Sequence, residues 1–187
     1  MRNADYFYDF CEDVWVDITF KFFKFKFSMR YFIKFSYNGS SFFGYQIQPN
    51  QISVQEVLEK ALSTLLREKI KTTGAGRTDT GVHAKKMFAH FDTEVTLPKD
   101  FVYRLNAFLP PSISIKQIIS VDENLHARFD ATYRTYEYYI SLSKNPFTEK
   151  TAWQFWKGNL EVEKMNEACK ILFVHTDFTS FSKLHTD

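Results

Sequence analysis

Apolar and polar residues alternate over residues 30–37, which predicts a half-buried strand that ends in a loop of Gly, Ser and Asn. At Ser53 the period changes, and apolar residues then recur every three or four positions, as on one face of a helix. Ser53 and Glu56 have the spacing of a capping box, so we expect the helix to begin there. Its apolar stripe indicates core packing and consists of Val54, Val57, Leu58, Ala61, Leu62, Leu65 and Leu66.

Four further segments have the composition and alternation of strands. In one of them Met87, Ala89 and Phe91 fall on a single face, and the last of them is long and rich in tyrosine. The four predicted strands are residues 70–73, 83–93, 112–121 and 131–142.

Two more helices are predicted, one over residues 99–108, which stops before two consecutive prolines, and one from Glu161 to Phe173. Strands and helices alternate too irregularly for a doubly wound parallel fold. We therefore expect an α+β chain whose helices pack on a largely antiparallel sheet. The apolar side of the last helix consists of Met165, Ala168, Cys169 and Leu172.

Composition narrows the function classes only a little. The net charge of +2 is too small to argue for nucleic-acid binding by itself, although 21 Phe and 10 Tyr make the chain rich in aromatic residues. No run of about 18 apolar residues predicts a membrane span. Cys11 and Cys169 lie far apart and the histidines are scattered, which favours a cytoplasmic, reducing compartment and argues against a metal site.

The segment from Gly74 to Ala84 is the most informative stretch of chemistry. It places one carboxylate, Asp79, in a loop with three glycines, directly after Arg77 and Thr78. Glycine lets the backbone take positive φ and lets another molecule approach closely, so the loop suits presentation of Asp79 to a substrate. A glycine-rich turn in which the Asp bonds its own backbone is the simpler alternative.

This segment resembles the catalytic loop of the tRNA pseudouridine synthase A family, in which the Asp of Gly-Arg-Thr-Asp is catalytic. Residues 37–46 resemble the family's N-terminal signature, with Asn38 where Asp is usual and Tyr45 where Trp is usual. Ser53 to Glu56 follows at the expected place. Residues 126–138 resemble the second active-site segment, and residues 177–181 match a later signature in part, because Val174 and Thr176 replace the usual Gly and His before it.

The resemblance implies a pseudouridine synthase fold, with two ferredoxin-like halves that share a central sheet. It implies isomerisation of uridine to pseudouridine at positions 38–40 of the tRNA anticodon stem–loop, without cofactor or metal, by a homodimer. Two alternatives stay open, a non-catalytic RNA-binding fragment of such an enzyme and a related synthase that acts on another RNA.

The resemblance also assigns roles to residues. Asp79 is the catalytic carboxylate, as nucleophile or as base, and Tyr136 stacks on the flipped uracil. Arg77 is suited to fill the vacated base stack or hold a phosphate, or to position Asp79 through a salt bridge. Thr78 and Arg128 complete the predicted substrate-binding set. Further predicted phosphate contacts are Lys85, Lys86 and Arg134, and predicted structural residues are His83 and Asn106.

We expect three regions along the chain. Residues 1–28 lie outside the resemblance and are either an upstream extension from a misassigned start, with Met29 as the natural one, or an accessory strand. Residues 29–122 form the first half with the catalytic loop 74–84, and residues 123–187 begin the second half. The later family segment, with a basic residue that pairs with the catalytic Asp, is not found, so we expect a C-terminally truncated and poorly active chain.

Overall fold

The computed structural model describes residues 28–181, which divide into two compact units at the peptide between Asp130 and Ala131. The predicted N-terminal extension lies outside the described residues, apart from its last residue.

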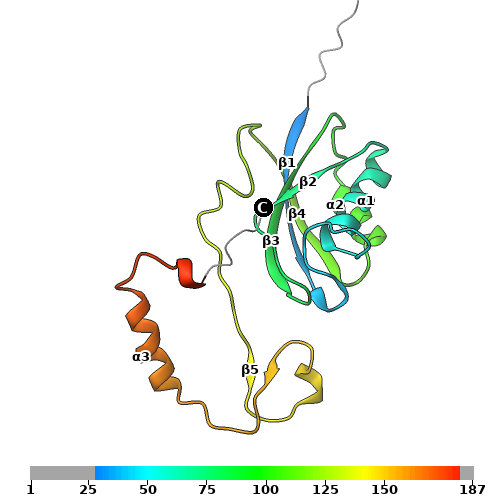
Figure 1. Ribbon diagram of the computed structural model, residues 1–187. Coiled ribbons are helices and arrows are strands. Elements are labelled where there is room, and N and C mark those ends of the chain that lie inside the picture. Colours follow the sequence, from blue (N-terminus) through cyan, green and yellow to red (C-terminus); the bar gives the residue numbers. More distant parts are fainter. Residues whose placement is uncertain (1–27, 182–187) are drawn as a thin grey trace, which may run out of the picture. The chain divides into compact units, whose positions relative to one another are not determined.

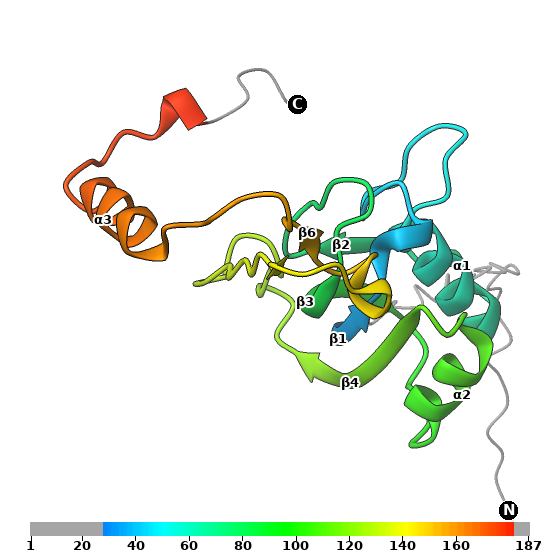
Figure 2. The same ribbon diagram turned by 90° about the horizontal axis from the view of Figure 1, so that it is seen from below.

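The first unit is a four-stranded antiparallel sheet with two helices on one of its faces, as Figures 1 and 2 show from two directions. The strand order is β2-β3-β1-β4, and β1 is the central strand that pairs with both β3 and β4. A single turn of 3-10 helix, η1 (Gly39–Ser41), follows β1. The other elements of the unit are β1 (Met29–Tyr37), α1 (Val54–Leu66), β2 (Thr72–Gly74), β3 (Ala84–Thr93), α2 (Phe101–Phe108) and β4 (Ile113–Val121).

The core lies between the sheet and the two helices, and it confirms the predicted patterns. Alternate residues of β1 are buried, and Ser53 caps α1 by accepting a hydrogen bond from the Glu56 amide, as expected. Asn106 fixes the turn between α2 and β4 through two hydrogen bonds with the backbone of Ile115, at 2.7 and 2.9 Å. The largest fully buried side chains are Phe35, Phe91, Ile33, Leu58, Leu62 and Leu105.

The opposite face of the sheet is partly covered by residues 122–130, the segment after β4. The Ala127 amide donates to Nδ1 of His90 on β3 at 3.1 Å. Arg30 on β1 forms a two-pronged ion pair with Asp92 and also donates to the carbonyl oxygens of Glu123 and Leu125. Strands β1 and β3 therefore hold this segment in place with polar groups, whereas apolar side chains hold the helices.

The second unit has little regular structure, and one strand prediction is wrong. Residues 131–139 form no strand, and only β5 (Ile140–Ser141) of the predicted 131–142 pairs, in parallel, with β6 (Trp153–Gln154). Alternation of tyrosines predicts a pleated surface but supplies no partner strand, and the described residues offer none to this segment.

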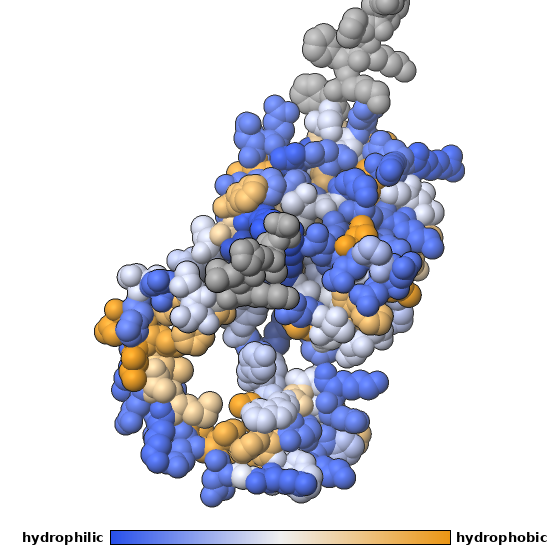
Figure 3. Space-filling view, viewed as in Figure 1, coloured by the Kyte–Doolittle hydropathy of each residue, from blue (hydrophilic) through white to orange (hydrophobic). Residues whose placement is uncertain are grey.

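The last predicted helix is confirmed as α3 (Val162–Leu172), preceded by the 3-10 turn η2 (Pro146–Thr148) and followed by η3 (Thr179–Phe181). None of its residues is buried in the described structure. Met165 and Leu172, on the side predicted to be apolar, are 46% and 42% exposed. Figure 3 shows apolar residues gathered along α3.

Candidate active site

Asp79 lies in the loop 75–83, which connects β2 to β3 on the first unit. Its side chain and that of Arg77 are exposed, and Thr78 between them is half-buried. The carboxylate thus faces solvent from a loop that begins and ends on neighbouring strands of the sheet, where its backbone can be held firmly.

The backbone of this loop is fixed by the segment that follows β1. The Tyr45 amide donates to the Thr78 carbonyl at 3.1 Å, and the Gly81 amide donates to the Phe42 carbonyl at 3.2 Å. Within the loop, the Val82 amide donates to the Asp79 carbonyl at 3.2 Å. Hydrogen bonds therefore hold the residue before Asp79 and the residues two and three after it.

Two side chains add to this attachment. The hydroxyl of Tyr37, at the end of β1, lies 2.9 Å from the Thr78 hydroxyl, and burial raises the pKa of Tyr37 so that it stays protonated. At the other end of the loop, Nδ1 of His83 accepts from the Gly39 amide at 3.1 Å. The predicted role of His83, to fix the loop by a side-chain hydrogen bond, is confirmed.

Gly39 and Gly44 are required because the loop passes so close to them. A Cβ at Gly39 would lie 2.0 Å from the Val82 carbonyl oxygen. A Cβ at Gly44 would lie 2.4 Å from the Thr78 carbonyl oxygen, and Gly44 also has a φ of +83°. The glycines of residues 37–46 thus serve the Asp79 loop, a relation that spacing along the chain does not express.

The start of α1 supports the same assembly from the other side. The amides of Val54 and Gln55 donate to the carbonyls of Gly44 and Tyr45 at 3.2 and 2.9 Å. The Gln55 side chain donates to the Thr72 carbonyl at 2.8 Å, and buried Glu59 accepts from the Thr72 amide at 2.8 Å. The motif at Ser53–Glu56 therefore joins residues 44–45 to β2, the strand that leads into the Asp79 loop.

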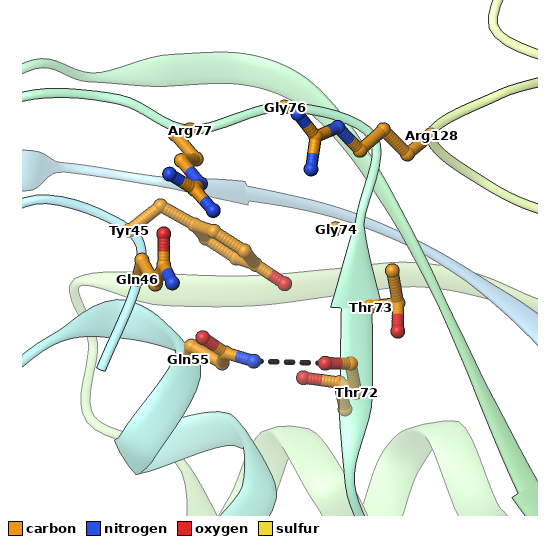
Figure 4. A pocket seen from close by; sticks show the side chains of 9 residues that line it. All are labelled: Tyr45, Gln46, Gln55, Thr72, Thr73, Gly74, Gly76, Arg77 and Arg128. Carbon is orange, nitrogen blue, oxygen red and sulfur yellow. Dashed lines mark hydrogen bonds between the residues drawn. The ribbon is translucent and has the colours of Figure 1, made fainter. Parts of the chain in front are cut away.

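A small polar pocket of about 190 Å³ lies behind the first part of this loop. Its floor includes Tyr45, which is 2% exposed. Arg77 comes from the loop and Arg128 from the segment after β4, so two predicted substrate-binding arginines reach one pocket, as Figure 4 shows. The residues that line it are Tyr45, Gln46, Gln55, Thr72, Thr73, Gly74, Gly76, Arg77 and Arg128.

The segment that carries Arg128 is held by two histidines. The amides of Arg128 and Phe129 donate to Nδ1 of His126 at 3.2 and 3.3 Å, and the His126 ring lies 4.6 Å from that of His90. Burial, and then Arg30 and His126, lower the pKa of His90, which keeps its Nδ1 free to accept from Ala127. The guanidinium of Arg128 lies 5.9 Å from the centre of the Phe129 ring.

The structure does not bring the other predicted substrate contacts together with Asp79. Tyr136 and Arg134 lie in the second unit, where the Tyr136 side chain is 73% exposed, and nothing positions them relative to Asp79. Lys85 and Lys86 are exposed at the start of β3. Sequence reasoning missed Tyr37 and Tyr45 as supports of the site. The only signal in the sequence was their position in the 37–46 motif, where Tyr37 is the first residue and Tyr45 the last but one.

Asn38 replaces the usual Asp in this motif without loss of its local contact. Its side-chain oxygen accepts from the Ser40 amide at 3.0 Å and caps η1, which a carboxylate would do in the same way. Within residues 28–181 no three His, Cys, Asp or Glu side chains are grouped as metal ligands would be. In that same part of the chain, every helix is too short or too polar to cross a membrane.

The sequence matches known proteins over most of its length. The family described as tRNA pseudouridine synthase matches residues 33–130, which contain the Asp79 loop and the Arg128 segment. Among similar curated proteins, tRNA pseudouridine synthase A of Bacteroides thetaiotaomicron is 54% identical over 159 residues, which is 84% of this chain and 59% of that protein.

Two further relatives have the same name. The tRNA pseudouridine synthase A of Parabacteroides distasonis is 52% identical and that of Bacillus subtilis 42%, covering 84% and 85% of this chain. The matches cover 63% and 66% of those two proteins. The chain therefore spans about three-fifths of the length of the first curated relatives that it matches.

Proposed function

The chain belongs to the tRNA pseudouridine synthase family, and from this premise we propose that it isomerises uridine to pseudouridine in tRNA, with Asp79 as the catalytic carboxylate. The observation that carries the proposal is an exposed Asp79 on a loop fixed at both ends by the 37–45 segment. A carboxylate held in this way can be presented to a substrate without a large change of the backbone.

The reaction requires little beyond such a group. The N1–C1′ bond of uridine breaks, the uracil turns, and a C5–C1′ bond forms while the C5 proton leaves and N1 gains a proton. No atoms or electrons are gained overall. A carboxylate near C1′, C2′ and C6 can act as nucleophile or as base.

The target base must leave its stack before Asp79 can reach it. We propose that Tyr136 stacks on the flipped uracil, since stacking on an aromatic side chain is worth about 1–3 kcal/mol per base. Arg77 lies two residues before Asp79 and is exposed, and its planar guanidinium is suited to fill the vacated stack or to hold a phosphate. Thr78 and Arg128 complete the proposed contacts with RNA.

Membership of the family supports further proposals on the target positions, the oligomeric state, the compartment and the division into halves. We propose positions 38–40 of the anticodon stem–loop as the targets, a homodimer as the active form of the complete protein, and the cytoplasm as its compartment. We further propose that residues 29–122 form the first of two ferredoxin-like halves and that residues 123–187 begin the second.

The test is tritium release from a tRNA transcript labelled at uridine C5, with the 187-residue chain beside an Asp79→Asn variant. We expect slow release by the unchanged chain and none by the variant, because the amide is neither a nucleophile nor a base at neutral pH. Binding of the transcript should stay within a few-fold, since the amide has nearly the shape of the carboxylate. Transcripts with a single uridine at 38, 39 or 40 locate the target.

Each other outcome is informative. Release that persists in Asp79→Asn contradicts the catalytic assignment. Binding without release by the unchanged chain favours a non-catalytic RNA-binding chain. Release from a uridine outside positions 38–40 favours a related synthase with another target.

A further inference from the structure

The turn 126–130, which carries Arg128, is held together through His126. Its Nδ1 accepts from the amides of Arg128 and Phe129 at 3.2 and 3.3 Å, and its carbonyl accepts from the Asp130 amide at 3.0 Å. In the other direction, the His126 amide donates to the Asp130 carboxylate at 2.6 Å. His126 therefore acts as a cap at the start of the turn, where a side-chain acceptor bonds the amides that follow it.

A second histidine holds this turn on the sheet. Nδ1 of His90, on β3, accepts from the Ala127 amide at 3.1 Å. The rings of His90 and His126 meet edge to face, with their centres 4.6 Å apart. Three consecutive amides, those of residues 127–129, thus donate to the imidazole nitrogens of two histidines in contact.

Arg128 reaches the pocket behind the Asp79 loop from the middle of this turn, and Figure 4 shows its guanidinium among the lining side chains. The guanidinium lies 5.9 Å from the centre of the Phe129 ring, which in turn stacks on the His126 ring at 4.3 Å. The backbone of Arg128 and the ring beside its charge are therefore both in contact with His126. This histidine determines where the positive charge of Arg128 lies.

The three hydrogen bonds require neutral imidazoles. A nitrogen that accepts from an amide carries no proton, so each neutral ring carries its single proton on Nε2. Protonation of Nδ1 turns the acceptor into a donor that faces another donor, and the bond is lost. The usual cap residues Ser, Thr, Asn and Asp do not change charge near neutral pH, whereas histidine does. A histidine cap therefore makes the turn sensitive to acid.

The surroundings of His90 favour its neutral form. Burial first, and then Arg30 on β1 and His126, lower the pKa of His90 below its ordinary value of 6.5, while Asp92 on its own strand acts in the opposite direction. His90 is thus neutral at pH 7.5 and gains its proton in mild acid. The charged groups in contact with the two histidines or with Arg30 are Asp92, Glu123, Arg128 and Asp130.

We propose that His126 and His90 are positioning residues for Arg128, and that protonation of this pair releases the arginine and weakens the binding of RNA. This role rests on the proposed function, in which Arg128 contacts RNA. The expected sign is the reverse of the ordinary one. Added positive charge strengthens the binding of a polyanion, whereas added protons at this pair should weaken it.

The positioning role is tested by binding of a tRNA transcript at pH 7.5, with the complete chain. His126→Ala should weaken binding about fivefold, the equivalent of one net hydrogen bond, and no more than Arg128→Gln does. In the Arg128→Gln background His126→Ala should have no further effect, because the charge that it positions is then gone. His126→Asn should bind as the unchanged chain does, since its amide oxygen takes the place of Nδ1. Additive losses in the double variant overturn the positioning role.

The pH dependence of binding is a readout that a merely structural role would not move. His126→Asn should bind as well as the unchanged chain at pH 7.5 and several-fold more tightly than it at pH 5.5. The control His175→Asn, at an exposed position of the second unit, should follow the unchanged chain at both values. If the pair acted only as added positive charge, His126→Asn would bind more weakly at pH 5.5, and this result overturns the proposal.

Two measurements on the free chain keep the test independent of RNA. Circular dichroism at each pH shows whether every protein is folded, and His126→Asn with the pH series decides if His126→Ala is not. Nitrogen NMR of the imidazoles should find Nδ1 of both histidines without a proton at pH 7.5. The amides of residues 127–129 should lose their protection from hydrogen exchange as the rings titrate. A proton on either Nδ1 at pH 7.5 overturns the proposal.

These outcomes separate the histidine pair from the catalytic assignment. Coupled losses of binding in a chain that releases no tritium support the pair and count against Asp79 as the catalytic group. Release that depends on Asp79, with His126→Ala unchanged in affinity, leaves the chemistry in place and overturns the pair. A chain that binds no transcript at either pH overturns the role of the pair as well.

Discussion

At the scale of single residues, the site depends on the absence of side chains as much as on their presence. Gly44 and Gly81 have nearly the same φ, +83° and +80°, but different surroundings. A Cβ at Gly44 would meet the Thr78 carbonyl at 2.4 Å, whereas a Cβ at Gly81 would meet nothing within 4 Å. Alanine at Gly81 therefore adds backbone strain alone, whereas alanine at Gly44 adds the same strain and a steric clash.

We predict that Gly81→Ala costs about 1–2 kcal/mol of unfolding free energy, the usual cost of a left-handed residue with a Cβ. Gly44→Ala should cost clearly more, because the carbonyl of Thr78 must also move, and it should lower turnover by displacing Asp79. Urea unfolding and tritium release measure the two effects. Equal costs for the two variants would show that the loop yields easily and is not held as described.

Residue roles that depend on local chain geometry were predictable from the sequence. Asn106 was expected to orient local backbone, and it bonds Ile115, 9 positions along the chain. His83 was expected to fix the Asp79 loop, and it does so, but through the Gly39 amide 44 positions away, a partner that the sequence did not identify. Tyr37 and Tyr45 were not recognised as supports of the site, because their partner Thr78 lies more than thirty positions away. A pattern of residue types identifies what a side chain can do, but a distant partner appears only in three dimensions.

At the scale of elements, the segment 122–130 is attached to β1 and β3 through groups that titrate. His90 faces Arg30, Asp92 and His126, and it accepts from the Ala127 amide in its neutral form. The pKa of His90 is lowered by burial first, and that of Asp92 by its bond with Arg30 first. Both groups therefore bind protons more readily in the unfolded chain than in the folded one.

The sign of the pH effect follows. The contribution of neutral His90 to the free energy of unfolding is complete above the unfolded pKa of about 6.5. This contribution falls as the pH drops below that value. Asp92 stabilises the fold fully above its ordinary pKa of 3.8, and this stabilisation is lost only in stronger acid, as the pH falls through the lowered pKa of the folded state. We predict that stability falls between pH 7 and 5, at no more than about 1.4 kcal/mol per pH unit for the one proton of His90.

Urea unfolding at pH 7, 6 and 5 measures this, with His90→Gln and, as a control, His175→Gln in the second unit. His90→Gln should flatten the pH dependence, since the amide oxygen can accept from Ala127 without titrating. His175→Gln should keep the dependence of the unchanged chain. A dependence that survives in His90→Gln would place the titrating group elsewhere.

The elements themselves were largely predictable, since their period reflects which face is buried. The helix after Ser53 and the strand with Met87, Ala89 and Phe91 agree with their patterns. The predicted strand 131–142 failed for a physical reason, because strand formation requires hydrogen-bond partners and the described residues supply them only to Ile140–Ser141. Burial periodicity is a property of one segment, whereas pairing is a property of two.

At the scale of the whole molecule, buried residues are distributed unequally. Every buried member of the main apolar cluster lies between Tyr31 and Ile115, and the further buried residue Ala127 also belongs to the first unit. In residues 131–181 no described residue is buried, and Tyr133 and Tyr138 are 89% and 91% exposed. Since burial of apolar surface is the main source of stability, the first unit should unfold cooperatively, whereas the second should open locally at little cost.

We therefore predict that, among the sites in residues 28–181, trypsin at low concentration cuts first within residues 131–181, with Arg134 as the earliest site, and leaves the sheet and helices of the first unit intact. Proteolysis of native protein follows the equilibrium population of open forms, and this population is large only where few apolar contacts must break. Mass spectrometry of the products over time identifies the order of the cuts.

The variant Arg134→Gln tests whether exposure or sequence preference directs the first cut. Removal of this one site should shift early cleavage to Lys144 or Lys150, in the same unit, and leave β1, β3 and α1 uncut. In 6 M urea the order should disappear, because both units are then open. Early cuts at Lys60 in α1 or Lys86 in β3 would show that the core does not protect the sheet, and that the stability of the Asp79 loop depends on residues beyond the first unit.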